Sequence, residues 1–125
     1  MEQQPIMRQQ LSKTRVLVVE DEIVVSEDLQ QRLRALGFNV VGAADTAADA
    51  IQLATSARPD VALMDIMLHG RPEGIDAAEY LRSELDIPVI YLTAHSDAAT
   101  LQKARLTDPA GYIVKPFDDK QLRVA

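Results

Sequence analysis

Five polar side chains stand directly after short apolar runs of this chain and are of the types that phosphoryl chemistry uses. They are Glu20, Asp21, Asp65, Thr93 and Lys115. An aspartate can accept a phosphoryl group as an acyl phosphate, which is a form of covalent catalysis. Phosphoryl transfer otherwise depends on positioning and charge stabilisation. We therefore predict that Asp65 is the nucleophile, with the Thr93 hydroxyl and the Lys115 ammonium directed at the phosphoryl oxygens.

Three of these side chains are acids, which would repel one another at one edge of a sheet unless a cation neutralised them. Mg²⁺ is the predicted cation, because it accepts one or two carboxylates, keeps several waters and leaves room for phosphate oxygens. We expect that Mn²⁺ can substitute for it. Calcium would need more protein ligands, and soft metals would need thiolates or clustered histidines. The chain has no cysteine, and its two histidines, His69 and His95, stand apart in expected loops.

The polar side chains can meet only if the apolar runs before them form neighbouring strands. Short apolar runs that alternate with helical patterns are typical of parallel strands buried on both faces. Open parallel sheets place their sites just beyond the carboxyl ends of the strands. Right-handed crossovers would place helices on both faces and give a three-layer α/β domain. The five expected strands are residues 15–20, 38–43 and 60–65, one from residue 88, and 112–114.

Local signals mark the helices between these strands. The first expected helix follows the first strand and ends at about Leu36. The next three run from Thr46 to just before Pro59, over 74–85 and over 97–106, and the last begins near Asp118. Gly37 is well placed to cap the first helix at its C-terminus. Thr46 with Asp49 three residues later is a capping-box pattern, and Pro59 should stop the second helix. The predicted buried stripes are Val25, Leu29, Leu33 and Leu36 in the first helix and Ile75, Ala78, Leu81 and Leu85 in the third.

The composition is that of one globular domain. The 125 residues are 47% hydrophobic and 26% charged, which is ordinary for a folded soluble chain. The formal net charge of −6 makes direct contact with nucleic acid unfavourable. No segment approaches the roughly 20 apolar residues needed to cross a bilayer, so membrane insertion is not expected. The absence of cysteine fits a reducing cytoplasm.

The two ends of the chain differ from its middle. Residues 1–14 are rich in glutamine and lack the apolar core of a secretory signal, so we expect a flexible N-terminal tail. The folded domain is expected over residues 15–125. Its last helix would start near Asp118 and stop at Ala125 after barely two turns, and we interpret it as truncated.

Four segments carry a resemblance to a known family. The segments are Val18–Glu22, Met64–Leu68, Pro88–Ala94 and Gly111–Phe117. In their order and spacing they resemble the receiver domain of bacterial two-component response regulators over about residues 15–125. The resemblance implies a flavodoxin-like fold, a doubly wound five-stranded parallel sheet with strand order 2-1-3-4-5.

The resemblance also implies roles for the acids. Asp65 would be the phosphoacceptor. Asp21 and Asp65 would bind Mg²⁺ directly, Glu20 would bind it through water, and the backbone carbonyl of Met67 would add a ligand. The family usually has an aspartate where this chain has Glu20. The glutamate side chain is one methylene longer, so its reach to the cation can differ by that length.

A switch is implied as well. Thr93 and Tyr112 would form the switch pair, and Lys115 would bind the phosphoryl group. The Lys115–Pro116 peptide is expected to be cis, a geometry that proline makes accessible. Phosphorylation would draw in Thr93, let Tyr112 turn inward and change the face formed by residues 97–106, the last strand and the last helix. The same face is the expected surface for a homodimer, and the truncated helix would form part of it.

Other positions depart from the usual pattern or invite two interpretations. His69 stands where a proline is usual, in a loop one residue longer than in the commonest members; similar loops occur in receivers tied to multi-domain sensor kinases. In the family, the positions of Met67 and His95 tune how quickly water removes the phosphoryl group. We hypothesise that the apolar Met67 hinders in-line water and prolongs the phosphoryl state. Ile23 and Val24 cannot both join the buried stripe of their helix, and are either ordinary exposed residues or a docking surface for a partner kinase.

The predicted function is a phosphoacceptor that takes a phosphoryl group from a histidine kinase or a histidine phosphotransfer domain. It would act as a switch and not as a turnover enzyme. A phosphohydrolase with an aspartyl intermediate would need a second acid where Met67 stands. A pseudo-receiver that binds partners without phosphorylation would normally have lost Asp65, Lys115 or an acid of the pair. A flavin-binding protein would need a phosphate-cradling loop after the first strand, and this chain has none.

Overall fold

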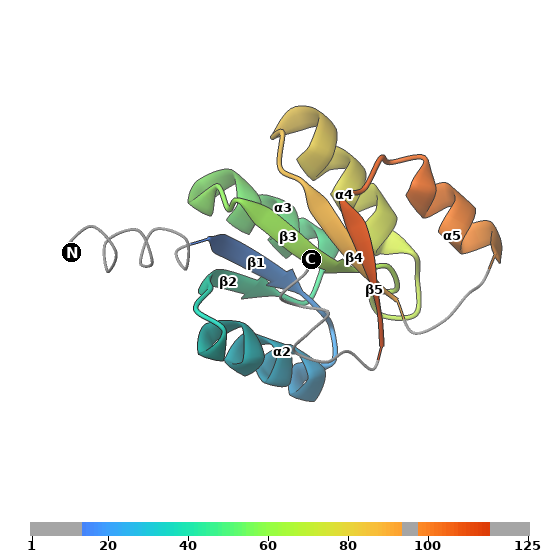
Figure 1. Cartoon of the computed structure of the whole chain (residues 1–125). Helices are drawn as coiled ribbons and strands as arrows, with labels where there is room; N and C mark the ends of the chain where they lie inside the picture. The colour runs from blue at the N-terminus through green and yellow to red at the C-terminus, as the bar shows by residue number, and fades with distance from the viewer. Residues whose placement is uncertain (1–13, 94–97, 116–125) are drawn as a thin grey trace.

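The computed structural model describes residues 14–93 and 98–115, and its centre is a five-stranded parallel sheet in the order β2-β1-β3-β4-β5 (Figure 1). The strands are β1 (Arg15–Val19), β2 (Asn39–Ala44), β3 (Val61–Asp65), β4 (Val89–Thr93) and β5 (Gly111–Val114). The helices are α2 (Ile23–Ala35), α3 (Ala47–Ala57), α4 (Glu73–Glu84) and α5 (Ala98–Arg105). The predicted strand order is confirmed, and the elements expected within the described residues lie within a few residues of the observed ones.

Helices cover both faces of the sheet, which confirms the three-layer architecture. On one face, Leu17 and Val19 of β1 pack in a cluster with residues of α3 and α4. On the other face, Val16 and Val18 pack with Leu29 of α2. Alternate residues of one strand thus enter two separate cores, because successive side chains of a strand point to opposite faces. This double burial is why the central strands are continuous apolar runs.

The predicted helix ends follow from local hydrogen bonds. The Thr46 side chain accepts a hydrogen bond of 3.1 Å from the backbone N–H of Asp49 and caps α3. Gly37 has a φ of 98° after the last turn of α2. Its neighbour Phe38 donates its N–H to the carbonyl of Leu33 at 3.0 Å, so the end of the helix turns as expected for a glycine cap.

The buried stripe of α4 is confirmed, with Leu85 partly buried at its end, but that of α2 needs one correction. The buried residues of α2 are Ser26, Leu29 and Leu33. Leu36 is partly buried and packs against the same core at the helix end, whereas Val25 is only partly buried. The helix is rotated toward Ser26, whose hydroxyl accepts a 3.0 Å hydrogen bond from Nε2 of Gln30 and is thereby partnered. A polar side chain is tolerated there because its hydroxyl is hydrogen-bonded.

Several predictions fall outside the described residues. They concern His95, the N-terminal tail apart from Thr14, the start of a helix at Asp97, and everything after Lys115. Among the helices that the structure describes, none is both long and apolar enough to span a membrane.

Candidate functional site

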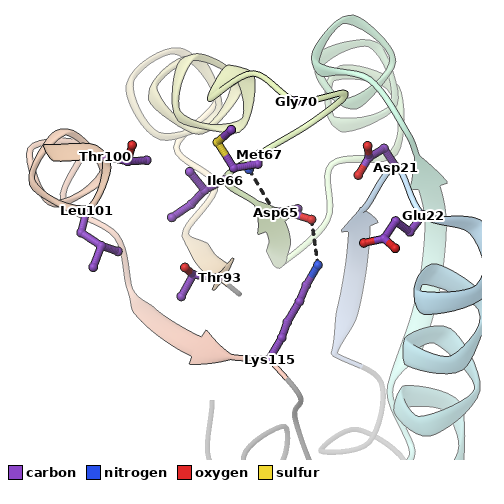
Figure 2. Close-up of a pocket in the computed structure, with 10 residues that line it drawn as sticks. All are labelled: Asp21, Glu22, Asp65, Ile66, Met67, Gly70, Thr93, Thr100, Leu101 and Lys115. Atoms are coloured by element: carbon purple, nitrogen blue, oxygen red, sulfur yellow. Dashed lines mark hydrogen bonds and ion pairs between the residues drawn. The ribbon is translucent and has the colours of Figure 1, made fainter. Parts of the chain in front are cut away.

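The carboxyl ends of four strands bring the predicted side chains to one edge of the sheet. Asp65 ends β3, Thr93 ends β4 and Lys115 follows β5, while Glu20 and Asp21 follow β1. A cavity of about 470 Å³ opens at this edge, and four of these five side chains line it, all but Glu20. Figure 2 shows Asp65 at its centre, with Asp21 on one side and Thr93 on the other. Residues distant in the sequence thus share one cleft, as predicted.

Lys115 connects the buried acids. Its Nζ atom lies 2.9 Å from Oδ2 of Asp65 and 2.5 Å from Oε1 of Glu20. Asp65 is 6% exposed and Glu20 is 2% exposed, so both carboxylates are largely removed from water. Burial alone would lower the pKa of Lys115, but its hydrogen bonds to the two acids outweigh burial and raise that pKa. The ammonium is therefore held in its charged form.

The three acids at this edge form a set of hard oxygen donors. Glu20, Asp21 and Asp65 each offer a carboxylate oxygen, and these oxygens lie within 4.8 Å of one another. Burial raises the pKa of Glu20 to about 7, although hydrogen bonds from Lys115 and the Glu22 backbone act in the opposite direction. This donor chemistry fits a small hard dication, which would favour the charged form of every acid.

Asp21 differs electrostatically from Glu20. Partial burial would raise the pKa of Asp21, but a hydrogen bond from the backbone N–H of His69 and one involving Glu20 together lower it. Asp21 is therefore ionised over the neutral range, whereas Glu20 titrates within it.

Asp65 is held by its own loop as well as by Lys115. The backbone N–H of Met67 donates a 3.1 Å hydrogen bond to Oδ1 of Asp65 (Figure 2). The Met67 residue is 43% exposed and lines the cavity. Each oxygen of Asp65 thus has a partner, which fixes the orientation of the carboxylate. The part predicted for the Met67 carbonyl remains a prediction.

Gly74 supports the backbone of Asp65 from behind. A Cβ atom built at Gly74 would lie 1.9 Å from the carbonyl oxygen of Asp65, a distance that no side chain permits. The N–H of Gly74 also donates to the carbonyl of Ile66 at 3.0 Å. Gly70 has a positive φ, but Gly74 does not. A left-handed backbone conformation is therefore not the reason for a glycine at position 74. Close approach of two backbones requires it, a role that the sequence did not reveal.

The loop after Asp65 contains a contact that was not predicted. His69 was expected to be a solvent-exposed loop residue, and its side chain is 54% exposed. Its backbone N–H, however, donates a 2.9 Å hydrogen bond to Oδ2 of Asp21. The sequence signal that could have suggested a tight turn is the His69–Gly70 pair, because histidine and glycine are among the residues that adopt positive φ.

The predicted switch residues lie on neighbouring strands. Thr93 is buried, while Tyr112 is 41% exposed and its ring stacks on Tyr91 with centroids 6.0 Å apart. The Tyr91 hydroxyl shares a 2.7 Å hydrogen bond with Oγ1 of Thr107, and Thr107 also donates to the carbonyl of Ala104 in α5. Burial raises the pKa of Tyr91 to about 12. Tyr91 therefore links the ring of Tyr112 to the end of α5, a connection that sequence analysis missed.

The remaining predicted residues divide into two groups. Ile23 and Val24 are 71% and 80% exposed, so neither joins the buried stripe of α2. His95 and Pro116 lie outside the described residues, and with Pro116 so does the predicted cis peptide.

Comparison with known proteins agrees with this geometry. The sequence profile of the response regulator receiver domain matches residues 16–125. Transcriptional regulatory protein PdtaR of Mycobacterium tuberculosis is 38% identical over 108 residues, which are 86% of this chain and 52% of the relative. Phyllosphere-induced regulator PhyR of Methylorubrum extorquens is 36% identical over 83% of this chain and 39% of its own length. The chain therefore spans about half or less of these relatives.

Solved structures show the same likeness. The signal receiver domain of a modulated diguanylate cyclase from Desulfovibrio desulfuricans G20 superposes with a TM-score of 0.84 at 36% identity, over 90% of this chain and 89% of that one. The signal receiver domain of the putative response regulator NarL from Mycobacterium tuberculosis gives a TM-score of 0.80 at 33% identity, over 88% and 90%. This chain belongs to the response regulator receiver domain family.

Proposed function

We propose that this receiver domain accepts a phosphoryl group on Asp65 from the phosphohistidine of a partner histidine kinase or histidine phosphotransfer domain. An oxygen of the Asp65 carboxylate would attack phosphorus, the phosphorus–nitrogen bond to the histidine would break, and the imidazole would leave with its electron pair. The observation that supports this proposal is the position of Asp65 in a cleft between a fixed ammonium group and two further acids.

The chain's own residues prepare Asp65 for this reaction. The Met67 N–H and the Lys115 ammonium orient its carboxylate. After transfer, Lys115 could exchange its bond to the carboxylate for one to a phosphoryl oxygen, and the Thr93 hydroxyl could donate to another. Positioning and charge of this kind are what phosphoryl transfer requires of a protein.

The acids fit the divalent cation that the family implies. Asp21 and Asp65 would hold Mg²⁺, or Mn²⁺ in its place, with Glu20 acting through water and the carbonyl of Met67 as a further ligand. When bound, the cation supplies positive charge that offsets the acids and the phosphoryl oxygens. Glu20 would then be ionised, and the positive charge of the cation would offset its carboxylate, so that the Lys115 ammonium could turn to a phosphoryl oxygen.

The output of the domain is a change of surface and not turnover of a metabolite. In the proposal, Thr93 moves toward the phosphoryl group and Tyr112 turns inward, which biases the face formed by α5 and β5. A partner or a second copy of the chain would read this face. The net charge of −6 supports a protein partner over nucleic acid. We also propose that the domain acts in the cytoplasm.

The test compares wild type with Asp65→Asn after incubation with a small phosphodonor and Mg²⁺. Intact mass should show a single phosphoryl adduct on wild type, no adduct on the variant, and none on wild type when the cation is chelated. An adduct of equal yield on Asp65→Asn would remove Asp65 as the acceptor. No adduct on folded, cation-loaded wild type would favour the pseudo-receiver interpretation.

A further inference from the structure

We infer that the backbone N–H of His69 positions the Asp21 carboxylate for the divalent cation. His69 is thus a positioning residue that acts through its main chain and not through its imidazole ring. The inference rests on the cation site of the proposed function and adds to it a residue that is not itself a ligand.

The loop that carries His69 is a tight hairpin. Leu68 and Arg71 form an antiparallel bridge, in which the Leu68 N–H donates to the Arg71 carbonyl at 2.8 Å and the Arg71 N–H donates back at 3.1 Å. The two residues between them, His69 and Gly70, have φ values of 53° and 76°. Positive φ at both central residues is the requirement of a type I′ turn. Leu68 is fully buried, so the hairpin is anchored in the core.

This hairpin directs one N–H group at Asp21. The His69 nitrogen lies 2.9 Å from Oδ2 of Asp21, a normal hydrogen-bond distance. The Nδ1 atom of the His69 ring lies 3.9 Å from the same oxygen, too far for a hydrogen bond. The geometry therefore assigns the contact to the backbone.

Holding one oxygen of Asp21 affects how its carboxylate meets a cation. A carboxylate fixed by a hydrogen bond does not have to be ordered when the cation arrives, so its ligand atoms are already oriented. Hydrogen bonds to metal-binding carboxylates commonly account for a factor of about 10 to 100 in metal affinity. Asp65 is fixed in the same way by the Met67 N–H, so two acids of the site are oriented by two amides of one loop.

The contact depends on which residue stands at position 69. Proline has no N–H and a φ near −65°, so it could neither make this hydrogen bond nor adopt the observed backbone. Asparagine retains the N–H and tolerates positive φ. His69→Asn therefore removes only the imidazole, whereas His69→Pro removes the imidazole and the N–H together with the turn that presents that N–H to Asp21.

The experiment is calorimetric titration of Mg²⁺ into wild type and both variants without a phosphodonor, with chemical denaturation to establish that each is folded. We expect His69→Asn to bind within about twofold of wild type and His69→Pro to bind about tenfold more weakly or worse. Equal affinity of wild type and folded His69→Pro would overturn the inference. A loss in His69→Asn as large as in His69→Pro would also overturn it, because the ring would then be responsible.

A measurement on wild type keeps the inference testable if His69→Pro does not fold. The His69 amide should exchange slowly with solvent, with and without Mg²⁺, and rapidly in Asp21→Ala, which lacks the acceptor. Rapid exchange in Mg²⁺-loaded wild type would overturn the inference.

Failure of this inference can be told apart from failure of the proposed function. Unchanged affinity of His69→Pro together with a phosphoryl adduct on Asp65 would refute only the positioning role. Absence of any Mg²⁺ binding by wild type would refute the cation site itself.

Discussion

The Nζ atom of Lys115 lies 2.9 Å from Oδ2 of Asp65, and the same ammonium group donates to Glu20. One ammonium group thus pairs with two buried acids, one at the end of β3 and one just after β1. Removing one partner of a buried ion pair leaves a charge without compensation, which commonly costs about 3 to 5 kcal/mol. This relationship makes Lys115 important for stability as well as for its proposed contact with the phosphoryl group.

Lys115→Met should therefore lower the free energy of unfolding by about 3 kcal/mol in the absence of divalent cation. Part of the loss should return on addition of Mg²⁺, because the cation would replace the missing positive charge. Urea denaturation with and without Mg²⁺ measures both effects. Lys103→Met is the matched control, since Lys103 is exposed on α5 and its loss should change stability by less than about 0.5 kcal/mol. Equal losses in the two variants would contradict the role given to Lys115.

Gly74→Ala should destabilise the fold and reduce phosphorylation together. The new methyl group would collide with the Asp65 carbonyl, so the start of α4 or the end of β3 must shift. We expect a loss of about 2 kcal/mol or more and a lower rate of adduct formation. Gly111→Ala is the control, because its Cβ would meet only Ile90, at 4.0 Å. A Gly74→Ala protein as stable and as reactive as Gly111→Ala would show that the close approach is unimportant.

Stability should depend on pH through Glu20. Burial raises the pKa of Glu20 from 4.5 to about 7. An acid with a higher pKa in the folded state stabilises the fold fully below its unfolded pKa, and this contribution is lost as the pH rises through its folded pKa. In cation-free buffer, the unfolding free energy of wild type should therefore fall relative to Glu20→Gln between about pH 4.5 and 7. The lowered pKa of Asp21 acts oppositely, with its contribution lost as the pH falls through its folded pKa.

Denaturation of wild type and Glu20→Gln across this range provides the measurement. Glu27→Gln, at an exposed position of α2, serves as the control and should follow wild type. Parallel curves for wild type and Glu20→Gln would contradict the raised pKa. The same proton should be released when Mg²⁺ binds, so Mg²⁺ affinity should increase from about pH 6 to 8.

Met67 should control the lifetime of the phosphoryl group. Its side chain lines the cleft beside Asp65, where an apolar group would hinder an in-line water. Replacing Met67 with Asn or Glu should therefore accelerate loss of the phosphoryl group, measured as decay of the adduct after the phosphodonor is removed. The backbone N–H of residue 67 is kept in both variants, so Asp65 stays oriented. An unchanged decay rate would refute the hypothesis.

Much of the fold and the meeting of the site residues could be predicted because they depend on short patterns. Asp65 and Thr93 end buried strands, Lys115 follows one, and parallel strands present their carboxyl ends at one edge. Thr46 caps its helix through a residue three positions away, so the necessary information is local. The family resemblance supplied the order of the strands, which such patterns alone do not determine.

The contacts that were missed all depend on residues distant in the sequence. The amide of His69 meets Asp21 across 48 positions, and this pairing follows from the turn that the hairpin adopts. Gly74 is required by a backbone that passes behind it and not by its own φ. The bond between Tyr91 and Thr107 depends on where the end of α5 lies against β4. Such pairings arise from tertiary structure, which hydrophobic periodicity does not specify.

Phosphorylation of Asp65 is tested most directly by locating the phosphoryl group on the chain. Borohydride reduces an aspartyl phosphate to homoserine, so peptide mass spectrometry of treated, phosphorylated wild type identifies the acceptor. We expect homoserine at position 65 and at no other aspartate, with its yield dependent on Mg²⁺. Homoserine at a different position, or an adduct without homoserine at 65, would rule out Asp65 as the phosphoacceptor.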